Sequence, residues 1–152
     1  MEKKFETIDD ILDFAIDSEQ EAVDFYNELA ESSKTEDMKK VFAQFAREEI
    51  GHKARLTKVK KEGAYKLTSA QVRDLKIGDY LVDVKPSSDM TYEEALVLAM
   101  KREKNAFKLY LDLAEKAPDN QMKELFQSLA QEESKHKLRF ELEYDEHVLR
   151  EN

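Results

Sequence analysis

The chain has no cysteine and no tryptophan, and only three glycines and two prolines among its 152 residues. Without cysteine, this chain cannot form disulfides, a thiolate metal site, a cysteine nucleophile or the ligands of an iron–sulfur cluster. Scarce glycine and proline, together with 39% charged residues, favour long helices over sheet or disorder. The composition therefore predicts a single all-α domain over residues 1–152.

The chain also lacks a net positive charge and long apolar runs. The formal net charge is −9, whereas nucleic-acid binding depends on clustered lysine and arginine, so no nucleic-acid partner is expected. The longest apolar run, at 95–100, is too short to span a bilayer, and the first residues, "MEKKFETIDD", contain no apolar signal core. We therefore expect a cytoplasmic protein with no membrane partner.

What the sequence does contain is an internal repeat. A shift of 84 residues aligns 7–56 with 91–140 without a gap, and 18 of the 50 aligned positions are identical. Because each copy has helical composition, we interpret the repeat as two helical hairpins, at about 7–62 and about 91–150. They are joined by a crossover at about 63–90, which breaks the helical pattern.

Local chemistry predicts the helix boundaries. Thr7 and Thr91 are expected N-caps, because each has an acidic residue three positions later. Turns are expected within 32–37 and 116–120, and Gly63 is the expected end of the second helix.

The crossover has a different pattern from the helices. Leu75, Ile77, Tyr80, Val82 and Val84 are mostly alternate residues, which predicts that part of the crossover is extended. Its length is enough to return the chain to the other end of the hairpins. The predicted fold is a four-helix bundle with one long connection.

Each predicted helix has a seam of apolar residues at steps of three and four, and a glutamate interrupts each seam near its middle. In the second and fourth helices a histidine follows three residues later, in "EIGH" (49–52) and "ESKH" (133–136). Residues equidistant from the turn of an antiparallel hairpin lie level, so all of these side chains should meet at one height. The six candidate metal ligands are Glu19, Glu49, His52, Glu103, Glu133 and His136.

Four carboxylates in a core cannot all ionise unless cations neutralise them. Two divalent cations would do so, and carboxylate with imidazole suits iron or manganese. The predicted cofactor is two iron ions, with manganese or mixed Fe/Mn as alternatives and zinc possible in isolated protein. One Glu-x-x-His alone would more often be a solvated helix face, and polar seam residues can also serve only to fix the register of a bundle.

Other polar residues near the seams are assigned more simply. Tyr26 and Tyr110 lie two turns from Glu19 and Glu103, and they are either core tyrosines or donors and redox-active groups beside the metals. Glu48 and Glu132 are predicted to be exposed. His147 has no counterpart in the repeat and is predicted to lie on the surface.

These motifs, Glu19…Tyr26, Glu49-Ile-Gly-His52, Glu103…Tyr110 and Glu133-Ser-Lys-His136, resemble the ferritin-like superfamily, and within it the rubrerythrin branch, over nearly the whole chain. The resemblance implies a left-handed four-helix bundle with two irons. It implies that Glu49 and Glu133 bridge them, that Glu19 and Glu103 are terminal carboxylates, and that His52 and His136 are terminal imidazoles.

The sequence departs from full rubrerythrins in two ways. Their cysteine-rich rubredoxin domain has no counterpart among these residues, and their extra carboxylate on the third helix falls near Ala106, which cannot bind metal. The site is therefore more symmetric, like that of bacterioferritin.

Three functions follow from this reading. The first is a di-iron oxidoreductase that reduces hydrogen peroxide or dioxygen with electrons from an external donor. The second is iron handling, as a ferroxidase that stores or transfers iron, and the third is a metal-stabilised bundle without turnover. A homo-oligomer is expected, with a dimer favoured.

Overall fold

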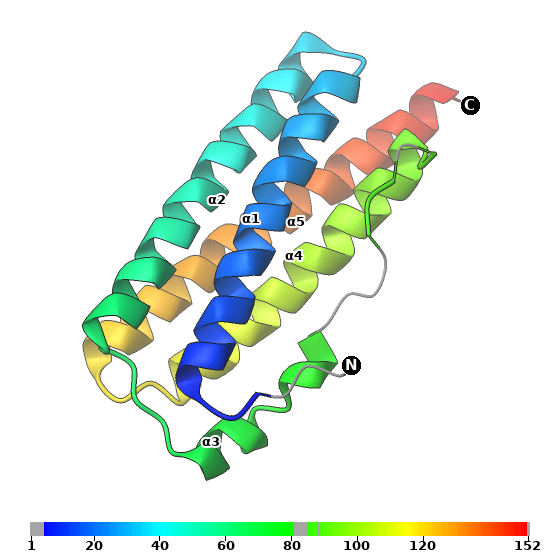
Figure 1. Ribbon diagram of the computed structural model, residues 1–152. Coiled ribbons are helices and arrows are strands. Elements are labelled where there is room, and N and C mark those ends of the chain that lie inside the picture. The colour runs from blue at the N-terminus through cyan, green and yellow to red at the C-terminus, as the bar shows by residue number, and fades with distance from the viewer. Residues whose placement is uncertain (1–4, 81–84, 88, 152) are drawn as a thin grey trace.

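The computed structural model describes residues 5–80, 85–87 and 89–151. All regular structure in these ranges is helical, as predicted from the composition (Figure 1). The elements are α1 (Ile8–Ser32), α2 (Glu36–Glu62), α3 (Ser69–Asp74), the 3₁₀ helix η1 (Ile77–Tyr80), α4 (Tyr92–Glu115) and α5 (Asn120–Glu151).

The four long helices form a bundle of two hairpins. Helix α1 packs mainly on α2, and α4 packs mainly on α5. The crossover returns the chain from the end of α2 to the opposite end of the bundle, so that α4 begins near the α1–α2 turn and runs antiparallel to α1 (Figure 1). This confirms the ferritin-like bundle with one long connection.

The helix boundaries follow the predicted caps. Thr7 Oγ1 accepts a hydrogen bond from the Asp10 amide at 3.2 Å, and Asp10 accepts one from the Thr7 amide at 3.1 Å. Thr91 and Glu94 form the same reciprocal pair. Helix α2 ends at Gly63, whose φ of 61° lies in the left-handed region that favours glycine. The repeat thus begins each hairpin with the same capping box.

The crossover is more helical than the alternating pattern predicted. Thr68 and Gln71 form a capping box that begins α3, and Val72, Leu75 and Ile77 are buried against the lower ends of the long helices. The extended conformation predicted for part of the crossover is not found at residues 69–74 or 77–80, where a local cap begins α3 and where η1 contains Ile77 and Tyr80. Val82 and Val84 lie outside the described residues.

Two apolar clusters fill the bundle at different heights. The lower one joins the start of α1, the ends of α2 and α4, the start of α5 and the crossover. The upper one joins the end of α1, the starts of α2 and α4, and Phe140 of α5. The level between them contains the glutamates and histidines of the interrupted seams. The fold thus places a polar layer between two dry ones.

Among the described residues, we find no helix with the length and apolar character needed to cross a bilayer.

Candidate metal centre

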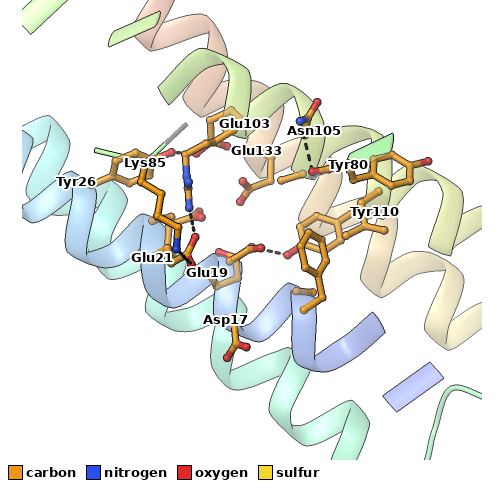
Figure 2. A pocket seen from close by; sticks show the side chains of 18 residues that line it. Asp17, Glu19, Glu21, Tyr26, Tyr80, Lys85, Glu103, Asn105, Tyr110 and Glu133 are labelled. Atoms are coloured by element: carbon orange, nitrogen blue, oxygen red, sulfur yellow. Dashed lines mark hydrogen bonds and ion pairs between the residues drawn. The ribbon is translucent and has the colours of Figure 1, made fainter. Parts of the chain in front are cut away.

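One glutamate from each long helix reaches the middle layer. Glu19 comes from α1, Glu49 from α2, Glu103 from α4 and Glu133 from α5, and each is at most 2% exposed. They lie there because each occupies a seam position of its helix, where an apolar residue would otherwise point into the core. Figure 2 shows that Glu19, Glu103 and Glu133 point into the same space, whereas Asp17 points away from it.

The glutamates and histidines form two overlapping groups. Glu19, Glu49, His52 and Glu133 offer ligand atoms that all lie within 4.8 Å of one another. Glu49, Glu103, Glu133 and His136 do the same. The structure therefore brings together all six sequence-predicted ligands. Glu49 and Glu133 belong to both groups, and this shared place is the one that the resemblance implies for bridging carboxylates.

Both histidines direct Nδ1 towards the carboxylates. His52 Nδ1 lies 2.7 Å from Glu133 Oε1 and 3.2 Å from Glu49 Oε1, and His136 Nδ1 lies 3.3 Å from the same Glu49 oxygen. The two imidazole rings are nearly parallel, 13° apart, with centroids separated by 6.3 Å. The Glu-x-x-His spacing thus presents one ring nitrogen per histidine to the shared space.

The other ring nitrogen of each histidine contacts a glutamate of the opposite hairpin. His52 Nε2 lies 2.6 Å from Glu132, and His136 Nε2 lies 2.6 Å from Glu48. These glutamates were predicted to be exposed, but they are only partly so, because their carboxylates turn inward to the rings. Arg55 also contacts Glu132 at 3.0 Å. A signal was present in the sequence, since both glutamates are identical in the repeat and directly precede a candidate ligand.

The two seam tyrosines make equivalent crossed contacts. Tyr26 donates its hydroxyl to Glu103, and Tyr110 donates to Glu19 (Figure 2). Burial, together with the nearby carboxylates, raises the pKa of both phenols well above the usual range. Each tyrosine is therefore a buried, protonated donor to a glutamate of the candidate site, and a redox role for either tyrosine stays a prediction.

The ligand atoms that face the centre lie close to one another but form no hydrogen bonds. Within the described part of the chain, each candidate ligand has one buried atom without a hydrogen bond, and these atoms are Glu19 Oε2, Glu49 Oε1, His52 Nδ1, Glu103 Oε2, Glu133 Oε1 and His136 Nδ1. Unpaired buried polar atoms cost free energy and are rare in native proteins. Six of them converging on one space fit a binuclear metal site.

The electrostatics of the metal-free site support this fit. Burial, followed by the charge of the neighbouring carboxylates, raises the pKa of Glu49 and Glu133 well above the usual range. Burial opposes a charged His52, but the adjacent Glu133 and Glu19 outweigh it and raise its pKa to about 10. Protons thus relieve the repulsion when no cation is bound, and divalent cations would relieve it in their place.

A cavity of about 280 Å³ connects this layer with the surface between α1 and α4. Glu19, Glu49, Glu103 and Glu133 form its floor, and Tyr80 and Lys85 of the crossover lie at its mouth (Figure 2). We call this cavity the α1–α4 chamber. It gives small molecules a route to the candidate metal positions.

His147 is not on the surface as predicted. It is 5% exposed, its ring packs edge-on against Tyr92 at 5.1 Å, and its Nε2 lies 3.4 Å from Glu93. The prediction was wrong because α5 extends beyond the repeated segment, and the seam of His136 and Phe140 continues along it to His147. No metal-ligand group forms at this end among the described residues.

Comparison with known proteins agrees with the fold and the site. The family model described as rubrerythrin matches residues 10–144, which include most of both hairpins, the crossover and all six candidate ligands. No curated protein and no solved structure matches the chain. On the strength of the family match, the chain belongs to the rubrerythrin family.

Proposed function

We propose that this protein is a dinuclear metal oxidoreductase that reduces hydrogen peroxide or dioxygen with electrons from an external donor. The observation that supports it most directly is the set of six ligand atoms without hydrogen bonds that are directed into one buried space. The rubrerythrin family match supports the same class of site. Iron is the proposed metal, with manganese or a mixed pair as alternatives.

The residues divide the work of holding two ions. Glu19 and His52 would hold one, Glu103 and His136 the other, and Glu49 and Glu133 lie in both groups of ligands. When bound, a pair of redox-active ions supplies two electrons, one from each, which is the number needed to cleave an oxygen–oxygen bond.

The surrounding side chains keep this ligand set in one arrangement. Glu132 and Glu48 hold the imidazoles so that Nδ1 faces inward, and Tyr110 and Tyr26 hold one oxygen of each terminal glutamate. The two apolar clusters exclude water from the bundle above and below the polar layer. The α1–α4 chamber remains as the route by which an oxidant reaches the ligands.

The test begins with the metal content of protein made in iron-supplied cells. The loaded protein is then reduced anaerobically and mixed in a stopped-flow instrument with peroxide or with oxygen. We expect about two irons per chain and oxidation of the reduced protein much faster than that of free Fe(II) at equal concentration. A rate no greater than that of free Fe(II) with either oxidant would sink the proposal.

Iron oxidation followed by storage or transfer is the second candidate. It is favoured by the symmetry of the ligand set, since Ala106 and its repeat counterpart Ala22 both line the chamber and neither supplies a further carboxylate. Storage needs a hollow multimer, whereas the expected homodimer offers no enclosed space. Light scattering of the iron-loaded protein decides between them, because a particle that stays a dimer excludes storage.

A further inference from the structure

The α1–α4 chamber is larger than hydrogen peroxide or dioxygen requires. Its volume is about 280 Å³. This is far more than the about 30 Å³ that a water molecule occupies in the liquid, and it is close to the about 300 Å³ at which pockets for small organic ligands begin. The floor of the chamber is the space that metal ions would share. Above that floor, the chamber still has room for more than a diatomic oxidant.

Its depth comes from small residues at repeated positions. Ala22 of α1 and Ala106 of α4 are equivalent in the 84-residue repeat, and both line the chamber one turn beyond Glu19 and Glu103. A larger side chain at either position would fill the space above the carboxylates. The two alanines therefore make the open volume, and the repeat preserves it on both sides.

One wall of the chamber is apolar. Phe14, Ala15 and Leu109 line it on the side of Tyr110, and Ala15 and Leu109 are also part of the buried lower cluster. An apolar wall beside a cluster of carboxylates suits a ligand with one polar end and one hydrocarbon end.

The mouth is where the two halves of the repeat differ. Ser18 and Glu21 of α1 correspond to Arg102 and Asn105 of α4. Arg102, with a side chain only 12% exposed, forms an ion pair with Glu21, and the Asn105 amide donates to the Tyr80 carbonyl at 3.4 Å. Lys85 Nζ lies 4.0 Å from Glu21 (Figure 2). Polar contacts thus narrow the entrance while the interior stays wide.

We propose that the chamber binds a small organic hydroperoxide, with its peroxide group over the carboxylates and its hydrocarbon group against Phe14, Ala15 and Leu109. This inference rests on the proposed function and names its substrate class. The oxygen–oxygen bond breaks, and two electrons from the reduced metal pair and two protons are taken up to give an alcohol and water; two solvent water molecules supply the protons and become hydroxide ions. An external one-electron donor restores the metals in two steps.

The kinetic test compares two oxidants on the reduced, iron-loaded protein. We expect tert-butyl hydroperoxide and hydrogen peroxide both to be consumed faster than by free Fe(II). Ala106→Leu should lower the rate with tert-butyl hydroperoxide by about tenfold or more. It should lower the rate with hydrogen peroxide by a much smaller factor, because the leucine side chain fills only the part of the chamber above the carboxylates. Ala22→Leu fills it from the opposite wall and should act alike.

A binding test needs no turnover. The product, tert-butyl alcohol, is titrated into zinc-loaded protein and followed by saturation-transfer NMR from the protein to its methyl signal. Saturable binding is expected, and Ala106→Leu should weaken it by about tenfold or more. Ala54→Leu is the matched control, because Ala54 is exposed on α2 and its repeat counterpart is Leu138. It should leave the binding unchanged, and circular dichroism shows whether each variant folds.

The outcomes separate this inference from the function on which it rests. Consumption of hydrogen peroxide but not of tert-butyl hydroperoxide would overturn the inference and leave the proposed function standing, as would equal losses with both oxidants in Ala106→Leu. Consumption of neither would overturn the inference together with peroxide reduction, and would leave dioxygen as the oxidant of the proposed function. Absence of saturable alcohol binding would overturn the chamber as a site for the hydrocarbon group.

Discussion

At the scale of single residues, each half of the repeat orients the ligands of the other half. Glu48 of α2 contacts His136 of α5, and Glu132 of α5 contacts His52 of α2. The tyrosines cross in the same way, since Tyr26 of α1 donates to Glu103 of α4 and Tyr110 of α4 donates to Glu19 of α1. Neither hairpin alone therefore contains a complete, oriented ligand set, which ties the chemistry to the docking of the two halves.

Glu132→Ala tests whether the glutamate on Nε2 positions the histidine. Loss of this contact frees the His52 ring to rotate away from the centre, and loss of such an outer carboxylate typically lowers metal affinity by about 10- to 100-fold. We expect a loss of that size in competition titrations against a coloured chelator. Glu124→Ala, an exposed glutamate of the same helix, is the control. Equal losses in both variants would contradict a positioning role.

Tyr26→Phe tests the hydroxyl that fixes Glu103. The variant removes one buried hydrogen bond, so the free energy of unfolding should fall by about 1 kcal/mol in urea titrations. Tyr65→Phe is a matched control, because the Tyr65 hydroxyl is also buried and donates to the Leu113 carbonyl at 2.6 Å, away from the centre. Both should lose similar stability, but only Tyr26→Phe should weaken metal binding. If Tyr65→Phe lowered the metal affinity as much as Tyr26→Phe, that result would contradict the role assigned to the Tyr26 hydroxyl.

Single residues were predicted best where helical periodicity alone decides their direction. Glu49 and His52 are three apart on one seam, so one face of one helix fixes both. Glu132 was missed because its inward turn depends on the neighbouring α2, which presents His52 and Arg55 to it. Contacts between helices depend on their relative rotation, which spacing along one chain does not give.

At the scale of elements, one glycine inside α2 and one that caps it have opposite roles. Gly63 ends the helix with φ at 61°, where a side chain is strained, whereas Gly51 is inside the helix and an added Cβ would meet nothing within 4 Å. Gly51 also corresponds to Lys135 of the repeat, so a side chain is accommodated at that level. The same residue type therefore stabilises the fold at one position and weakens it at the other.

Substitution by alanine should show this difference directly. Gly63→Ala should lower the free energy of unfolding by about 1 kcal/mol, because alanine disfavours the left-handed conformation. Gly51→Ala should raise it by about 0.5 to 1 kcal/mol, because glycine is a poor helix former. Urea unfolding of the metal-free proteins measures both. Changes of the same sign would contradict the assignment of Gly63 as the cap.

An ion pair between Glu21 of α1 and Arg102 of α4 has no counterpart in the other half of the repeat. Arg102→Ser restores at this position the residue that α1 has at Ser18, and it removes the ion pair with Glu21 at the chamber mouth. Because the pair is partly exposed, its contribution to stability is small. The entrance should widen instead, and bound metal should be lost to a chelator several-fold faster.

The matched variant for this experiment is Lys101→Ser, which removes an exposed cation from the neighbouring position of α4. It should leave the rate of metal loss unchanged. Similar acceleration in both variants would attribute the effect to charge rather than to the entrance. The measurement is the absorbance of the metal–chelator complex over time, with thermal unfolding as a check on folding.

Elements were predicted correctly where a local signal defines their ends. The threonine caps at Thr7 and Thr91, and the glycine at Gly63, each satisfy backbone groups within their own turn. The crossover was harder to predict, because the alternation from Leu75 to Tyr80 suits a strand, whereas Thr68 and burial against the lower cluster favour a short helix. Tertiary contacts override a weak local pattern there.

At the scale of the whole molecule, the middle layer weakens the bundle unless cations bind to it. Two apolar clusters stabilise the ends, but between them lie four carboxylates, each at most 2% exposed. Their mutual repulsion and desolvation raise the free energy of the metal-free fold. Metal binding would therefore be coupled to folding, since the unfolded chain does not hold these six residues together.

Removal of the metal should accordingly lower the thermal stability. If each ion is present at about 100 times its dissociation constant, it adds about 2.7 kcal/mol, so two ions add about 5 kcal/mol. For a chain of this size that corresponds to a fall in Tm of about 10 to 20 °C after chelation. The measurement is the circular dichroism signal of the helices at about 222 nm. In the double variant His52→Ala and His136→Ala, the chelator should leave Tm unchanged, because both imidazoles are absent. A Tm that chelation leaves unchanged in the parent protein would contradict the coupling, since repulsion among the four carboxylates would then need no cation to balance it.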